Sequence, residues 1–310
     1  MEKLFEIVNG NCNVTLFDNG TRIVETLDPN TTSIELDQPL SLDINISNRC
    51  SIGCPYCYAG NTPNGDVVDP LTMNYLDGAT GIEIAINIQF PVHPNFEAWL
   101  KKMKAQGIIV SGTVNQREFE KSPDVLSYIN YLHDNRLLNG IGVSYREYNP
   151  SLYGELKMAL LDDIVVHTIV GCTPIEDILD LLSKGFKVLV LGYKQKNRGI
   201  DYFTKINIDE WKKDINKLIN HQFNSVLAFD TAGLVQLGIK ELLTDEQWND
   251  SYQGDEGTIS FYIDAVKRTF NNNSHTDTPP YEIADLTINQ MFSIIKNALK
   301  GGDTNENIEK

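Results

Sequence analysis

One stretch of this 310-residue chain decides the expected fold. It begins as Ser41-Leu42-Asp43-Ile44-Asn45-Ile46-Ser47 and continues, two residues later, as Cys50-Ser51-Ile52-Gly53-Cys54-Pro55-Tyr56-Cys57-Tyr58. The first part alternates apolar and polar residues, which is typical of a β-strand. The second part holds three of the five cysteines in the spacing C-x3-C-x2-C. Thiolates bind soft metals, so this crowding directly after a strand predicts a metal centre.

The spacing favours an iron–sulfur cluster over the alternatives. Four-cysteine zinc and iron–sulfur sites fill every metal position with protein ligands, whereas three cysteines leave one iron of a [4Fe–4S] cube open to a small molecule. A zinc site needs a fourth ligand, but His93 is distant in sequence and Cys12 and Cys172 are isolated. Five cysteines without a secretion signal do not suit a disulfide framework. The predicted metal ligands are Cys50, Cys54 and Cys57.

Strand-like and helix-like segments alternate from Leu40 onward. Each strand-like run is followed by a helical period; one helix is expected to begin at Ser122-Pro123, and Thr173 and Glu176 have the spacing of a capping box. Such alternation predicts a parallel sheet with right-handed crossovers, with its reactive edge at the C-terminal ends of the strands. A partial barrel and a flat doubly wound sheet both fit this pattern. After the first strand, further strands are expected at 82–88, 108–114, 141–145, 164–170, 186–193 and 225–230.

The two ends of the chain differ from this core. Residues 13–27 have the pattern of a hairpin with Asn19-Gly20 in its turn, so residues 1–40 are expected to form a small β cap. Residues 258–264 alternate with period two, like an edge or capping strand, and Thr287 and Gln290 are spaced to cap a final helix. The expected domains are therefore a cap at 1–40, a core at 41–230, a C-terminal extension at 231–300 and a disordered tail at 301–310.

Composition limits the classes of function. The chain is 41% hydrophobic and 22% charged, which is typical of globular proteins. Its formal charge is −16, so extended binding to a nucleic-acid backbone is disfavoured. The sequence has neither a signal-peptide pattern nor an apolar run long enough to cross a membrane. We therefore expect a cytoplasmic protein without a membrane partner.

The cysteine spacing, together with the aromatic Tyr58 directly after the last cysteine, resembles the radical S-adenosylmethionine (radical SAM) superfamily. The resemblance implies an α/β fold, a partial (β/α)6 TIM-like barrel, with one [4Fe–4S] cluster and S-adenosylmethionine as cofactors. It implies an enzyme that cleaves S-adenosylmethionine reductively and abstracts hydrogen from a small-molecule or peptide substrate, with a flavodoxin or ferredoxin as electron donor. No cysteine follows Cys172, so auxiliary clusters are not expected. Residues 252–264 are similar to little-characterised radical SAM proteins of bacteria and phages.

The resemblance also implies cofactor contacts at the strand ends. Where the family usually has Gly-Gly-Glu-Pro, this chain has Ile88-Gln89-Phe90-Pro91, so only the proline matches. Thr113-Val114-Asn115-Gln116 looks like a looser form of the family's Thr-Asn-Gly. At the fourth strand, either Glu147 or Arg146 is expected to contact the ribose or the carboxylate of S-adenosylmethionine. The implied cofactor-binding residues are Tyr56, Tyr58, Gln89, Asn115, Ser144, Glu147 and Val170.

Candidates for contact with the substrate come from the same strand ends. Side chains of these types are more often solvated or structural than catalytic. The candidates are therefore chosen only because they lie at or after predicted strand ends. The candidate catalytic residues are Tyr145, Lys194, Arg198, Asp230, Tyr262 and Cys172.

Two other functions remain open on the sequence. One is a radical SAM enzyme that modifies a nucleotide or a nucleic acid, which the acidic charge disfavours. The other is a non-catalytic metal-binding or interaction protein on a decayed barrel, which the missing Gly-Gly-Glu-Pro motivates. The sequence does not specify the substrate.

Overall fold

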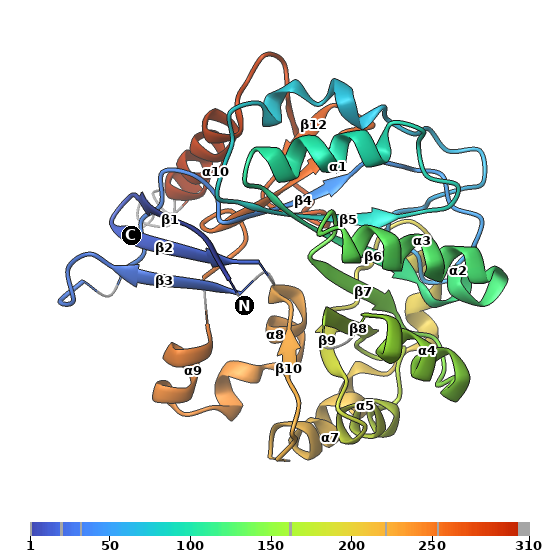
Figure 1. Ribbon diagram of the computed structural model, residues 1–310. Helices are drawn as coiled ribbons and strands as arrows, with labels where there is room; N and C mark the ends of the chain where they lie inside the picture. Colours follow the sequence, from blue (N-terminus) through green and yellow to red (C-terminus); the bar gives the residue numbers. More distant parts are fainter. Residues whose placement is uncertain are drawn as a thin grey trace.

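The computed structural model describes residues 2–18, 21–31, 33–160, 163–220, 222–252 and 254–302. The N-terminal part forms a small antiparallel sheet of β1 (Lys3–Asn9), β2 (Cys12–Phe17) and β3 (Arg22–Thr26) in that order (Figure 1). Strands β2 and β3 are the predicted hairpin, although its Asn19-Gly20 turn lies outside the described residues. Strand β1 was not predicted. It pairs with the other side of β2.

The main sheet has ten strands within the described residues, in the order β10-β9-β8-β7-β6-β5-β4-β11-β12-β13. Seven consecutive strands, β4 to β10, are parallel to their neighbours, which confirms six βα units after the first strand. The chain is therefore mixed α/β with a large parallel sheet. The bounds are β4 (Ser41–Asn45), β5 (Glu83–Ile88), β6 (Ile109–Asn115), β7 (Gly140–Ser144), β8 (Ile164–Ile169), β9 (Lys187–Leu191), β10 (Leu227–Phe229), β11 (Ser260–Asp264), β12 (Thr269–Asn271) and β13 (Tyr281–Glu282).

The strand predicted at 258–264 is present as β11, but it lies inside this sheet, so the edge position given as one alternative was wrong. It pairs in parallel with β4 on one side and antiparallel with β12 on the other. Its period-two pattern arises because the two faces of the sheet differ, and does not mark a free edge. The C-terminal part of the chain thus extends the core sheet directly.

The helices mostly connect neighbouring strands. In Figure 1, α1, α3, α4, α5 and α7 follow the outer side of the row of strands from β4 to β10. None of the helices in the described ranges is long and apolar enough to cross a membrane. The bounds are α1 (Phe96–Ala105), α2 (Gln116–Lys121), α3 (Pro123–Asp134), α4 (Pro150–Leu160), α5 (Ile175–Ser183), α6 (Arg198–Tyr202), α7 (Ile208–Ile219), α8 (Thr231–Leu237), α9 (Asp245–Ser251) and α10 (Ile288–Gly302), with short 3-10 turns at Pro70–Thr72, Asn74–Leu76, Phe203–Lys205 and Ile239–Leu242.

Two of the three predicted helix starts are confirmed. The Ser122 hydroxyl accepts a hydrogen bond from the Asp124 amide at the start of α3, and Thr287 and Gln290 bond reciprocally at the start of α10. The capping box predicted at Thr173 was wrong. Its hydroxyl accepts from the Ile169 amide at the end of β8, while α5 begins after Pro174 without a side-chain cap.

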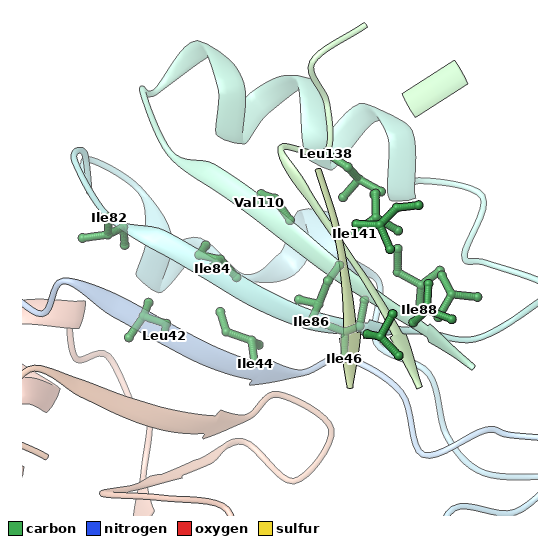
Figure 2. Packing of buried hydrophobic residues seen from close by; sticks show 14 of the residues in the cluster. Leu42, Ile44, Ile46, Ile82, Ile84, Ile86, Ile88, Val110, Leu138 and Ile141 are labelled. Atoms are coloured by element: carbon green, nitrogen blue, oxygen red, sulfur yellow. The ribbon is translucent and has the colours of Figure 1, made fainter. Parts of the chain in front are cut away.

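The two faces of the main sheet have opposite character. Side chains alternate along each strand, so Leu42 and Ile44 of β4 and Ile84 of β5 share one face and are buried (Figure 2). This apolar face packs beneath the helices. The other face, which we call the polar face, carries Asp43 and Asn45 of β4, which alternate along the strand with Leu42 and Ile44. The C-terminal ends of the parallel strands meet at one edge of the sheet, and the loops that follow them build the candidate site.

Candidate functional site

The loop that follows β4, residues 48–62, carries all three clustered cysteines; we call it the cysteine loop. It closes on itself through backbone hydrogen bonds, since the Cys50 amide donates to the Thr62 carbonyl (2.8 Å) and the Thr62 amide to the Asn48 carbonyl (3.0 Å). Just beyond this loop, Gly65 passes so close to Asn48 that a β-carbon on Gly65 would lie 2.0 Å from the Asn48 carbonyl oxygen. The fold therefore brings the three cysteines together on one constrained loop.

The three thiols are unpaired and partly exposed, and Cys50 and Cys57 lie near enough to Cys54 to influence it. Burial raises the pKa of the Cys54 thiol, and the neighbouring Cys57 and Cys50 raise that pKa further, while Arg146 and Arg117 oppose them. The Asn115 amide nitrogen lies 3.7 Å from the Cys54 sulfur. Positively charged side chains and an amide donor therefore surround thiols that would be anionic as metal ligands.

Three thiols form a donor set whose chemistry suits an iron–sulfur cluster. Within the ranges that the structure describes, no three His, Cys, Asp or Glu side chains converge on one point as ligands of one ion would. An iron–sulfur cube has an iron atom at each of four corners, so three cysteines that each bind a different iron do not have to converge. Soft thiolates are the ligands that such clusters use.

The segment that follows β9 holds the cysteine loop in place. The Arg198 guanidinium donates from Nε to the Cys54 carbonyl (3.0 Å) and from Nη1 to the Asn61 carbonyl (3.1 Å). The Asn197 side-chain amide donates to the Tyr58 carbonyl (2.6 Å). Arg198, predicted as a candidate catalytic residue, thus contacts the backbone of the cysteine loop on both sides of Cys57.

A cluster of charged side chains lies on the polar face beside this loop. Lys194 lies over the Tyr58 ring, with its amine 4.7 Å from the ring centroid, and donates to the Ser274 hydroxyl (3.1 Å). Burial lowers the pKa of Lys194, but Tyr58 and the carboxylates of Asp230, Asp43 and Glu256 together raise it above its ordinary value. Lys194 is therefore a firmly protonated cation among acidic groups.

Negative charge is in excess in this charged cluster. Burial raises the pKa of Glu256 to about 7; Lys194 opposes this shift, while Asp43 and Asp230 add to it. The Asp43 side chain is in contact with solvent, but other parts of the protein surround it. Desolvation by the surrounding protein therefore raises its pKa as well. The pKa of His275 falls to about 4, mainly through burial and also through Lys194. Three carboxyl groups thus lie around Lys194, and the pKa of Glu256 among them is raised to near neutral pH.

A pocket of about 340 Å³ opens between the cysteine loop and the C-terminal strands. Its wall combines the end of β4, the second half of the cysteine loop, the segment after β9 and the region from β11 to β13. Asn61 is 8% exposed and lines this pocket, and its side-chain oxygen has no hydrogen-bond partner within the described residues. Other residues of the wall are Asn45, Tyr58, Lys196, Tyr262 and Asn273.

The structure brings several predicted residues to this region. Tyr58 contacts Lys194, and Tyr262 lies in the pocket wall. The Asp230 carboxylate accepts from the Gly192 and Gly233 amides, so it also caps α8. Tyr56 packs against Tyr202, with ring centroids 5.6 Å apart.

Other predicted residues have structural contacts. The Tyr145 hydroxyl is directed to the Asp177 carboxylate of α5 (2.9 Å). Val170 is fully buried, and the Glu147 carbonyl accepts from the Gln116 side chain. Gln89 lies beside a small cleft near His93, at the end of β5. Ser144 ends β7 opposite His167, and burial raises the pKa of Cys172 to about 12.

Sequence reasoning missed Asp43, Glu256, His275 and Asn61. Their neighbours in the site are separated from them by long stretches of sequence, so no local pattern joins them. One signal was present in the sequence: Asp43 is a charged residue in the middle of a strand that the sheet encloses on both sides.

The fold is similar to that of solved structures. No protein-family model matches the chain, and no curated protein matches it. The crystal structure of SuiB from Streptococcus suis has a TM-score of 0.62 at 11% identity, covering 96% of this chain and 89% of SuiB. The structure of SuiB bound to S-adenosylmethionine has a TM-score of 0.55 at 12% identity, covering 87% of this chain and 69% of that one. At these identities the likeness establishes a shared fold.

Proposed function

We propose that this chain is a radical SAM enzyme whose cysteine loop holds one [4Fe–4S] cluster through Cys50, Cys54 and Cys57. The observation that carries the proposal is the set of three unpaired thiols on one loop at the C-terminal end of β4, where Cys50 and Cys57 lie near enough to Cys54 to raise its pKa. The likeness to SuiB, which has been crystallised with S-adenosylmethionine, supports it at the level of the fold. We further infer that strands β4 to β10 curve as a partial (β/α)6 barrel.

The residues around the loop have distinct roles in this proposal. When bound, the cluster supplies the electron that breaks a carbon–sulfur bond of S-adenosylmethionine. Asn115 donates towards the Cys54 sulfur, and Arg117 and Arg146 stabilise negative charge on the Cys54 thiolate. Tyr58 presents an aromatic ring beside the loop, where an adenine can pack. Tyr56, Gln89, Ser144, Glu147 and Val170 are retained as proposed cofactor contacts.

We assign the substrate, a small molecule or a peptide, to the 340 Å³ pocket. The pocket shares Tyr58 and Asn61 with the cysteine loop, so its occupant would lie beside the cluster. Lys194, Asp230 and Tyr262 are retained as candidate catalytic residues in or next to this pocket. Reduced thiols and a redox centre suit the cytoplasm, with a flavodoxin or ferredoxin as electron donor.

Anaerobic reconstitution with iron and sulfide tests the proposal. The wild-type chain should take up about four iron atoms and show iron–sulfur absorbance, and it should release 5′-deoxyadenosine when reduced with S-adenosylmethionine present. Cys54→Ala should lose both the absorbance and the cleavage. Cys12→Ala is the matched control, because Cys12 is buried in the small N-terminal sheet, and it should behave like the wild type.

The assignment fails if Cys54→Ala keeps its iron and its cleavage activity. It also fails if the wild-type chain binds zinc and gains no iron–sulfur absorbance.

A further inference from the structure

We propose that Arg198 is a positioning residue that fixes the cysteine loop around the three thiols. The inference rests on the proposed function, because it gives Arg198 the task of holding the loop in the form that binds a cluster. One guanidinium joins the carbonyls of Cys54 and Asn61, which lie before and after Cys57 in the loop. A planar guanidinium presents several donors in fixed directions, so it sets the spacing between two acceptors, which a single flexible amine does not.

Asn197 holds the cysteine loop at a third point, which lies between the Cys54 and Asn61 carbonyls in the sequence. Its side-chain amide donates to the Tyr58 carbonyl, and its own backbone has φ 47°, a conformation that non-glycine residues rarely adopt. Gly60 approaches it so closely that a β-carbon at Gly60 would lie 2.9 Å from the Asn197 side chain. Gly60, through its missing side chain, and Asn197, through its uncommon backbone conformation, thus permit the close approach of the two segments.

The position of Arg198 is itself fixed by packing. It is the first residue of α6, whose next residue, Gly199, lies against the Lys194 carbonyl and accepts a hydrogen bond from the Tyr193 hydroxyl (2.7 Å). The last residue of α6, Tyr202, packs against Tyr56 of the cysteine loop. The guanidinium thus projects from an element that is anchored to the segment directly after β9 and to the loop that it holds.

A binding or catalytic role would require Arg198 to direct its charge at a ligand. Two of its donors are instead taken by backbone carbonyls of the protein, in nearly equal hydrogen bonds. Its effect on the reaction would therefore pass through the loop. Losing it should loosen the three thiols while leaving the packed core intact.

Two measurements on Arg198→Gln, Arg198→Lys and the control Arg136→Gln test this role. Arg136 is an exposed arginine paired with Asp18, close to the N-terminal sheet. In the metal-free chain, the rate of Cys54 alkylation, followed by peptide mass spectrometry, should rise about tenfold in Arg198→Gln and stay at the wild-type rate in Arg136→Gln. In the reconstituted chain, iron loss to a chelator should be about tenfold faster in Arg198→Gln and intermediate in Arg198→Lys, with the thermal midpoint little changed.

Wild-type alkylation and iron-loss rates in Arg198→Gln would overturn the proposal. If Arg198→Gln does not fold, Arg198→Lys decides: rates equal to the wild type count against a guanidinium-specific role, and rates faster than the wild type support it. The alkylation measurement does not involve a cluster. A wild-type chain that takes up no iron, combined with faster alkylation in Arg198→Gln, would refute the radical SAM assignment but keep the positioning role.

Discussion

Along β4, neighbouring residues belong to two regions of very different character. Leu42 and Ile44 are buried in the apolar face beneath the helices, whereas Asp43, between them, is open to solvent on the polar face. The apolar face stabilises the fold by removing hydrocarbon from water. The polar face collects carboxyl groups whose charged forms burial disfavours. The comparison indicates that stability comes mainly from one side of the sheet. On the other side, burial and mutual repulsion disfavour the charged carboxylates, which are available for binding or chemistry.

Truncation on the apolar face should have the largest effect. Ile84 of β5 is completely buried, so Ile84→Ala should lower the free energy of unfolding by about 2–5 kcal/mol. Asn87→Ala, three residues along the same strand but on the polar face and exposed, should change it by less than about 0.5 kcal/mol. Chemical denaturation of both variants provides the measurement. Equal losses in the two variants would contradict the division between the faces.

Removal of the single lysine from the charged cluster should have an intermediate effect. Lys194→Gln leaves Asp43, Asp230 and Glu256 without their cation, so we expect a loss of about 1–3 kcal/mol at pH 8. The loss should be smaller at pH 5, because protonation then removes part of the repulsion between the carboxylates. Denaturant titrations at the two pH values compare the losses, and an equal loss at both would show that the lysine does not act through these carboxylates.

Glu256→Gln should have the smallest effect and the opposite sign. The pKa of Glu256 is raised to about 7 in the folded chain from an ordinary value of 4.5, so its contribution to stability is fully present below pH 4.5 and is lost as the pH rises through 7. The variant should therefore gain stability relative to the wild type between pH 5 and pH 8. A shift of this size corresponds to about 3 kcal/mol when fully expressed, and solvent screening of the partly exposed Glu256 should reduce the gain to about 1 kcal/mol. A difference in unfolding free energy that does not change with pH would contradict this shift.

The sequence predicted the local elements well because their causes are local. The period-two run of β4 and Ser122 before α3 are patterns within a few residues, and each is found in the structure. Helix α2 was not predicted. Asn115, expected as a cofactor contact at a strand end, accepts a hydrogen bond from the Arg117 amide and so caps this helix.

The candidate site was predictable only in part because it is built from distant segments. Asp43 belongs to β4, Lys194 follows β9, and Glu256 precedes β11, so their proximity depends on the order of the strands. Arg198 was selected for its place after a strand, but its hydrogen bonds to the cysteine loop depend on the path of α6. Position at a strand end therefore selected residues that lie near the cysteine loop, but it did not indicate the contacts that each side chain makes.

The pairing of β11 with β4 has a consequence for how the protein is made. Asn45 and Asp264 contact each other across the two strands although 219 residues separate them. During synthesis, β4 to β10 leave the ribosome long before β11 is available, so one side of β4 stays an open hydrogen-bonding edge in the nascent chain. A chain that stops short of β11 would keep this edge exposed, and it should self-associate through β4.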